Sequence, residues 1–272
     1  MSDLPILGAA LIVESLEIHR DLMLEKQRDL ELQDFTTADV LNGDWRPLVE
    51  RANKLLAGHT GRVGIHGPFW GLAVDTMDPE IREIVTKRLL QGLDVCEALG
   101  GTHMVVHSPF STWDHFNIDN YDKVRETKIE LSHLTMKGAV KRAEDIGCEL
   151  VIENIEDVDP TYRKDLVESF GSDAIKISID TGHAHYVYGR TGAPPVDYFI
   201  KSAGNLLRHI HLQDADGYAD RHWPLGDGNI QWASVFNALG KLDSDPRLII
   251  ELRNAAGLPR SIANMEALGL AQ

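Results

Sequence analysis

Short apolar runs alternate with longer amphipathic stretches along the chain. Most of the short runs are rich in Val, Ile and Leu, as is typical of strands buried on both faces of a parallel sheet. The eight predicted strands are Ile6–Ile12, Leu30–Phe35, Val63–Pro68, His103–Ser108, Glu149–Glu153, Ile175–Asp180, Arg208–Leu212 and Leu248–Leu252.

The stretches between these runs have helical periodicity. The clearest helix follows Asp78, whose side chain can accept hydrogen bonds from the first free N–H groups, and Pro79 suits the first helical position. Its apolar residues recur at helical spacing as far as Leu99, and Gly100 can end it. A second long helix is predicted from Tyr121 to Ile146. Further helices are predicted at Ser15–Lys26, Arg46–Ala57, Tyr162–Phe170, Val196–Ala203, Trp232–Leu242 and Leu258–Leu268.

Eight strand-then-helix units without a long linker predict an α/β fold, a single closed (β/α)8 TIM barrel. We therefore expect residues 1–272 to form one domain. The competing architecture is an open, doubly wound sheet, which usually has fewer strands and a glycine-rich phosphate-binding turn after the first strand. The first predicted strand is followed by no G-x-G-x-x-G motif, so the barrel is favoured.

The composition limits the function classes. With 43% hydrophobic and 25% charged residues, the chain is not disordered, collagen-like or a coiled coil. The 42 acidic residues outnumber the 27 basic ones, and a net charge of −15 argues against nucleic acid as a partner. Two cysteines cannot form a disulfide framework, which indicates a reducing compartment. The run Pro5–Val13 lacks a basic leader and is too short to span a bilayer, so we expect a cytoplasmic protein without membrane association.

Six successive predicted strands end in residues that can bind metal or transfer protons. Catalytic groups of a barrel occupy the carboxyl ends of its strands, and side chains alternate along a strand, so these six could face the axis at one level. A single such residue is most often structural, but six in succession are hard to explain in that way. Carboxylates converging there need a counter-charge, and the mixture with imidazole suits Zn²⁺, Mn²⁺, Fe²⁺ or Co²⁺. The six residues are His66, His107, Glu153, Asp180, His211 and Glu251.

The smallest complete site takes one residue from each of the last four strands: Glu153, Asp180, His211 and Glu251. Such a set binds one cation and leaves room for two substrate oxygens. Glu153 and Glu251 are expected on opposite sides of the substrate, where one can take a proton from carbon and the other return it. Five further residues would bind extra metal or hydrogen-bond substrate hydroxyls: His66, His107, His183, Asp220 and His222.

Taken together, the motifs that hold these residues resemble the xylose-isomerase-like TIM-barrel superfamily, which contains sugar phosphate isomerases and epimerases and the family 2 apurinic endonucleases. The epimerase branch implies a metal on the four-residue set, with the two glutamates as the proton-transfer pair and His183 at a substrate oxygen. The endonuclease branch implies a trinuclear zinc site that uses all nine candidate residues, so these positions alone do not separate the branches. The motifs are His66-Gly-Pro, Val106-His107-Ser-Pro, Ile152-Glu153-Asn154, Ile179-Asp180-Thr-Gly-His183, His211-Leu-Gln-Asp214, Asp220-Arg-His222 and Ile250-Glu251-Leu-Arg253.

Departures from the endonuclease pattern favour the first branch. Endonucleases open with a Gly-Ala-His strand, whereas this chain has Gly8-Ala9-Ala10. The loop after the second predicted strand carries Asp34, Asp39 and Asp44, with no Lys or Arg before Arg46. Such an acidic loop is poorly suited to binding the phosphates of DNA. This chain also departs from the epimerase pattern. In the epimerases an arginine often closely follows the histidine ligand, whereas here the nearest candidate after His211 is Arg221.

The leading hypothesis is a divalent-metal-dependent isomerase or epimerase of a small sugar or related polyhydroxy carbonyl compound, acting by glutamate-mediated proton transfer through a metal-bound enediolate. The alternatives are a related dehydratase, a multi-zinc phosphodiesterase such as an apurinic endonuclease, and a barrel that only binds a ligand. We expect one cation, with room for up to three, and a homo-oligomer is an open alternative to a monomer. The residues expected to contact a sugar-like substrate are His183, Arg221, Arg253, Trp70 and Trp113.

One charged segment is predicted to have no functional role. The stretch Arg20–Asp34 is expected to be an exposed helix face and its connection to the next strand.

Overall fold

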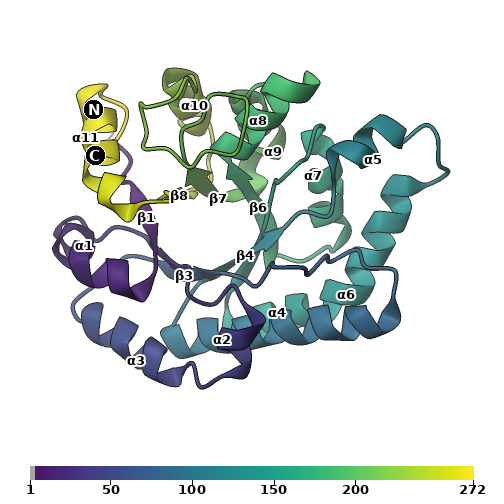
Figure 1. Cartoon of the computed structure of the whole chain (residues 1–272), viewed down its shortest axis with the longest axis horizontal. Coiled ribbons are helices and arrows are strands. Elements are labelled where there is room, and N and C mark those ends of the chain that lie inside the picture. The colour runs from purple at the N-terminus through teal and green to yellow at the C-terminus, as the bar shows by residue number, and fades with distance from the viewer. Residues whose placement is uncertain (1–3) are drawn as a thin grey trace.

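A closed barrel of eight parallel strands forms the centre of the computed structural model, which describes residues 4–272 (Figure 1). The strands pair in chain order, and the barrel closes where Gly8 and Ala9 of the first strand pair with Ile249 and Ile250 of the last. The strands are β1 (Gly8–Leu11), β2 (Leu30–Leu32), β3 (Val63–His66), β4 (His103–His107), β5 (Glu149–Glu153), β6 (Ile175–Asp180), β7 (Leu207–Leu212) and β8 (Arg247–Ile250).

Helices surround this barrel and follow one another around it in chain order, from purple α1 to yellow α11 in Figure 1. Within the described residues the α-helices are α1 (Val13–Glu25), α2 (Ala38–Asn42), α3 (Arg46–Leu55), α4 (Pro79–Leu99), α5 (Thr112–Asn117), α6 (Val124–Ile146), α7 (Pro160–Ser169), α8 (Thr181–Thr191), α9 (Val196–Ala203), α10 (Trp232–Leu239) and α11 (Leu258–Ala267). The α/β barrel predicted from the sequence is therefore confirmed.

The best-marked helix has the ends that its sequence predicts. The Asp78 side chain accepts hydrogen bonds from the backbone N–H groups of Glu80 and Ile81, and Pro79 occupies the first helical position of α4. Gly100 ends the helix in the left-handed region at φ 66°, which costs a glycine little. Local capping chemistry thus sets both ends of α4.

Helix α8 is the main element that the sequence prediction lacks. It begins directly after β6, with Asp180 as its N-cap, and its residues include glycines, tyrosines and a valine that favour helix weakly. The short helices α2 and α5 were not predicted either, and the remaining differences lie at element ends: α6, for example, begins at Val124 rather than Tyr121. Because α8 follows β6 without a loop, its first turn lies at the same barrel end as the polar strand termini.

Two structural facts concern membrane-spanning helices and the cysteines. Within residues 4–272, no helix combines the length and the apolar character needed to cross a bilayer. Cys96 and Cys148 are both buried and neither forms a disulfide.

Candidate metal centre

Four strands bring the predicted four-residue set together at one barrel end. Glu153 and Asp180 are the last residues of β5 and β6, His211 lies near the end of β7, and Glu251 directly follows β8. One ligand atom from each of the four lies within 4.8 Å of those of the others. The Nδ1 atom of His211 lies 2.8 Å from Glu153 Oε1 and 3.4 Å from Glu251 Oε2. The four side chains therefore form one compact cluster of metal-ligand atoms.

The donor atoms of this cluster suit a divalent cation. Glu153, Asp180 and His211 are at most 1% exposed, and Glu251 is 9% exposed. Glu153 Oε2 and Asp180 Oδ2 have no hydrogen-bond partner among residues 4–272. Buried carboxylate oxygens without partners are costly, and a bound cation would remove that cost. The donor atoms of these four residues therefore fit a divalent metal ion.

A second ligand group shares Glu153 with the first. The Nε2 atoms of His66 and His107 lie 3.7 and 3.5 Å from Glu153 Oε2, and 3.4 Å from each other. His66 Nδ1 lies 2.9 Å from the carbonyl oxygen of Gly67, an acceptor, so Nδ1 carries the proton and Nε2 presents a lone pair to the group. This arrangement also suits a cation.

A third group contains His183, Asp220 and His222. The Oδ1 atom of Asp220 lies 3.0 Å from His222 Nε2 and 3.6 Å from His183 Nε2. His183 Nδ1 donates to the carbonyl oxygen of Asn154 at 2.9 Å, which leaves its Nε2 atom as the lone-pair donor. His222 has a left-handed backbone, at φ 48°, which is uncommon for a residue with a side chain. All nine predicted ligand residues thus fall into three adjoining groups.

Gln213 connects the first and third groups, and sequence reasoning missed this role. Its Nε2 atom donates to Asp180 Oδ1 at 3.1 Å and to Asp220 Oδ1 at 2.9 Å, while its Oε1 atom accepts from the backbone N–H of His222 at 2.7 Å. Gln213 follows His211 by two positions, so alternation along the strand was the signal that could have identified it.

Several side chains of the site have shifted pKa values. Burial acts to raise the pKa of Glu153, but the charge and hydrogen bond of His211 outweigh burial and hold it well below the ordinary value. Burial raises the pKa of Asp180 to about 6 and lowers that of His107 to about 3. Strongly shifted pKa values of neighbouring groups are frequent at functional sites.

The residues predicted to contact substrate lie around this end of the barrel, and some are engaged elsewhere. Arg221 binds Asp216 through Nε and Nη2, at 3.1 and 2.8 Å. Arg253 donates to the backbone carbonyl oxygens of Arg221 and Asp220 and is exposed. Trp70 and Trp113 are 68% and 56% exposed, and their rings lie beside those of Phe69 and Tyr121, respectively.

The prediction for the charged stretch Arg20–Asp34 was wrong for two of its members. Arg28 is 2% exposed and donates to the backbone carbonyl oxygens of Leu7 and Gln272. Glu31 is fully buried inside the barrel, because it lies in the middle of β2 with its side chain on the inner face. Segment-level charge did not reveal this, although the period-two alternation of β2 could have done so.

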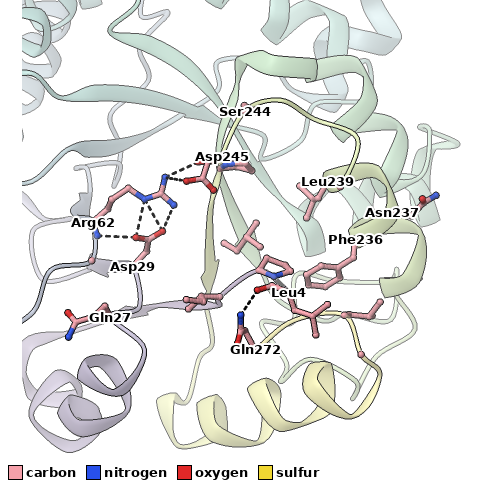
Figure 2. Close-up of a pocket in the computed structure, with 18 of the residues that line it drawn as sticks. Leu4, Gln27, Asp29, Arg62, Phe236, Asn237, Leu239, Ser244, Asp245 and Gln272 are labelled. Atoms are coloured by element: carbon pink, nitrogen blue, oxygen red, sulfur yellow. Dashed lines mark hydrogen bonds and ion pairs between the residues drawn. The ribbon is translucent and has the colours of Figure 1, made fainter. Parts of the chain in front are cut away.

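A cavity of about 980 Å³ lies at the opposite end of the barrel, lined by residues that precede β1, β2, β3 and β8 together with parts of α10 (Figure 2). Its main charged side chains are already paired: Arg62 binds both carboxylate oxygens of Asp29 and lies 3.2 Å from Asp245 Oδ2. The candidate metal groups lie at the other ends of the strands, so this cavity is not part of the site.

A family model described as a xylose isomerase-like TIM barrel matches residues 25–268. An uncharacterized protein of Methanocaldococcus jannaschii is 24% identical over 200 residues, which cover 70% of this chain and 64% of that protein. The chain therefore spans less than two thirds of that relative's length.

Solved structures show the same fold. A D-tagatose 3-epimerase-like protein superposes with a TM-score of 0.78 at 20% identity, covering 96% of both chains. A Thermus thermophilus protein soaked with ZnCl2 gives 0.68 at 24% identity over 96% of this chain and 98% of that one. A D-psicose 3-epimerase from Clostridium cellulolyticum, solved with D-tagatose, gives 0.65 at 17% identity over 93% of this chain and 84% of that one.

Proposed function

The chain belongs to the xylose isomerase-like TIM-barrel family, and we propose that it is a divalent-metal-dependent isomerase or epimerase of a small sugar or related polyhydroxy carbonyl compound. The observation that carries this proposal is the first ligand group, in which carboxylates of Glu153 and Glu251 approach the same imidazole nitrogen of His211 from two different strands. The names of two matched structures, a tagatose 3-epimerase-like protein and a psicose 3-epimerase, support the substrate class.

A divalent cation held by Glu153, Asp180, His211 and Glu251 would bind two neighbouring substrate oxygens and stabilise the negative charge that develops there when a carbon-bound proton leaves. Mn²⁺, Zn²⁺, Co²⁺ and Fe²⁺ all suit this donor set. We assign Glu153 and Glu251 to the proton transfer, because both are carboxylates at the site and the low pKa of Glu153 keeps it ionised as a base.

The two glutamates are held differently. Glu153 Oε1 lies 2.8 Å from His211 Nδ1, and its Oε2 atom has no hydrogen-bond partner among the described residues, so we infer that one oxygen binds the cation while the other takes the proton. Glu251 Oε1 accepts from the side-chain amide of Gln33, which orients the carboxylate from β2's carboxyl end. We assign His183, whose Nδ1 atom is held by the carbonyl oxygen of Asn154, to a contact with a substrate oxygen through Nε2. We assign the exposed side chains of Trp70 and Trp113 to contacts with the apolar face of a sugar.

Solvent exchange tests this proposal. The purified protein would be loaded separately with each of the four metals and incubated in D2O with a panel of ketoses and aldoses, with and without phosphate. We expect deuterium on a carbon next to the carbonyl, together with an epimer or an isomer as product. Loss of the β-hydroxyl would instead identify a dehydratase, and absence of exchange with every metal and sugar would contradict the proposal.

A second candidate function is hydrolysis of phosphodiesters at a multi-metal site, as in an apurinic endonuclease that cleaves abasic DNA. The observation that favours it is that nine ligand residues form three adjoining groups, with Glu153 common to two of them. Metal stoichiometry separates the candidates: one ion per chain supports the isomerase, whereas three ions together with cleavage of abasic DNA support the hydrolase.

A further inference from the structure

A second polar cluster lies inside the barrel, deeper than the candidate metal centre. It contains Glu31 of β2, His103 of β4 and His209 of β7, all fully buried. His209 precedes His211 by two positions on β7, so its side chain lies on the same inner face but one layer further from the barrel mouth. The mechanism proposed above uses none of these three residues.

Glu31 contacts three imidazole rings. Its Oε1 atom lies 3.0 Å from His211 Nε2, and its Oε2 atom lies 3.0 Å from His209 Nε2 and 3.4 Å from His103 Nε2. His209 is fixed from its other side, where its Nδ1 atom lies 2.8 Å from Ser178 Oγ. Glu31 is therefore an ionisable side chain without solvent contact, surrounded by histidines.

His211 is thus held between carboxylates on both ring nitrogens. Its Nδ1 atom faces Glu153 and Glu251 in the ligand group, and its Nε2 atom faces Glu31. A cation in the first ligand group would take the Nδ1 lone pair in place of the contact with Glu153. The remaining ring proton would then lie on Nε2, where the carboxylate of Glu31 accepts its hydrogen bond. A carboxylate behind a metal-binding histidine also makes the imidazole a stronger ligand.

We propose that Glu31 is a positioning residue, which orients His211 and fixes its tautomer so that Nδ1 binds the cation of the first ligand group. The inference rests on the proposed function only in assigning His211 as a metal ligand.

The alternative use of the same cluster is as a cation site of its own, because the three ligand atoms lie close together. The contact with His211 favours the positioning role, because Glu31 Oε1 lies 3.0 Å from a residue of the first ligand group and connects the cluster to that group directly.

The test compares Glu31→Gln with Ser178→Ala. Both residues are fully buried in the barrel, but Ser178 contacts His209 and not His211. We expect Glu31→Gln to lower the affinity for the cation of the first ligand group about 10- to 100-fold. This affinity would be measured by competition with a chromophoric chelator, using Zn²⁺ or Co²⁺ alone. In Ser178→Ala it should change less than about threefold, because the Glu31–His211 contact remains.

Unchanged metal affinity in a folded Glu31→Gln protein would overturn the proposal. So would the loss of one bound ion with the affinity of the remaining ion unaltered, since that result identifies the cluster as a separate cation site. If Glu31→Gln does not fold, nitrogen-15 NMR of histidine-labelled, zinc-loaded wild-type protein decides the matter. A protonated Nε2 and a metal-bound Nδ1 on His211 support the proposal, and coordination through Nε2 refutes it. None of these measurements involves a sugar, so failure of the proposed enzyme activity would leave their outcome readable.

Discussion

Asn154 binds both backbone groups of Asp180. Its Oδ1 atom accepts from the N–H of Asp180 at 2.9 Å, and its Nδ2 atom donates to the carbonyl oxygen of Asp180 at 3.1 Å. Arg163, which is 1% exposed, donates to the same Oδ1 atom at 3.0 Å. The ends of β5 and β6 are therefore fastened together directly beside two candidate ligands.

Asn154→Ala should lower the free energy of unfolding by about 2–4 kcal/mol, because several buried polar groups lose a partner at once. Chemical denaturation would measure this loss. The matched control is Asn205→Ala, which removes a similar two-way contact with Asp243 at an exposed position and should cost less than about 1 kcal/mol. Equal losses in the two variants would show that Asn154 has no special structural role.

Glu153→Gln and Glu251→Gln should each reduce sugar-dependent proton exchange about 10²- to 10⁴-fold, because an amide cannot accept the carbon-bound proton. Deuterium incorporation followed by NMR would measure the rate. Glu149→Gln is the control on the same strand: Glu149 is at the opposite end of β5 and pairs with Arg247. If Glu149→Gln slowed exchange as much as Glu153→Gln, the assignment of the proton transfer would be wrong.

Metal binding to the group of His183, Asp220 and His222 should tighten as the pH rises. Burial acts to lower the pKa of His222, but its hydrogen bond to Asp220 and the charges of Glu251 and Asp180 outweigh burial and raise it to about 9. A cation needs the neutral imidazole, so below pH 9 it must displace a proton. Burial also acts to lower the pKa of His183, but the charge of Asp180 and the hydrogen bond to Asp220 raise it well above its ordinary value, so a cation displaces up to two protons. Affinity at this group should therefore rise about tenfold to 100-fold per pH unit between pH 6 and pH 8.

Titration calorimetry in buffers of different ionisation enthalpy would count the protons released on metal binding. At least one proton per ion is expected at pH 7 for this group. Binding that released no proton and did not vary between pH 6 and 8 would contradict the prediction.

Two glycine substitutions should have opposite effects on stability. A Cβ atom on Gly64 in β3 would lie 2.2 Å from the ring of His103, which is buried and cannot withdraw, so Gly64→Ala should destabilise by about 1–3 kcal/mol or more. A Cβ atom on Gly138, an exposed position within α6, would meet nothing within 4 Å, so Gly138→Ala should stabilise by about 0.5–1 kcal/mol. Urea unfolding of both variants would check the two signs, and a neutral Gly64→Ala would show that the barrel interior can adjust.

The strands could be predicted because a parallel barrel buries both faces of each strand, which leaves a continuous apolar run in the sequence. All eight predicted strands overlap observed ones, and Glu149–Glu153 and Ile175–Asp180 agree in both bounds. Helix α8 was missed because packing against β7 and α9, rather than intrinsic propensity, stabilises its glycine- and tyrosine-containing sequence.

The candidate ligands could be predicted for a similar reason. Chemistry in this architecture collects at the carboxyl ends of strands, so position along the strand identified His66, His107 and Glu153 before any contact was known. The supporting residues are different. Glu31 and Gln213 matter through contacts between strands that lie far apart in sequence, and nothing local in the sequence shows which side chain meets which across the barrel. Their partners became visible only in three dimensions.

The cavity at the amino-terminal ends of the strands has a consequence for ligand discovery. A small molecule that binds between Phe236 and the Arg62–Asp29 pair would raise the melting temperature of the protein, as any ligand of the folded state does. It would do so from the far end of the barrel, without competing with a cation or a sugar. Hits from a thermal-shift screen of this protein should therefore be sorted by whether added metal or a chelator changes their affinity before any is taken as a lead to the substrate.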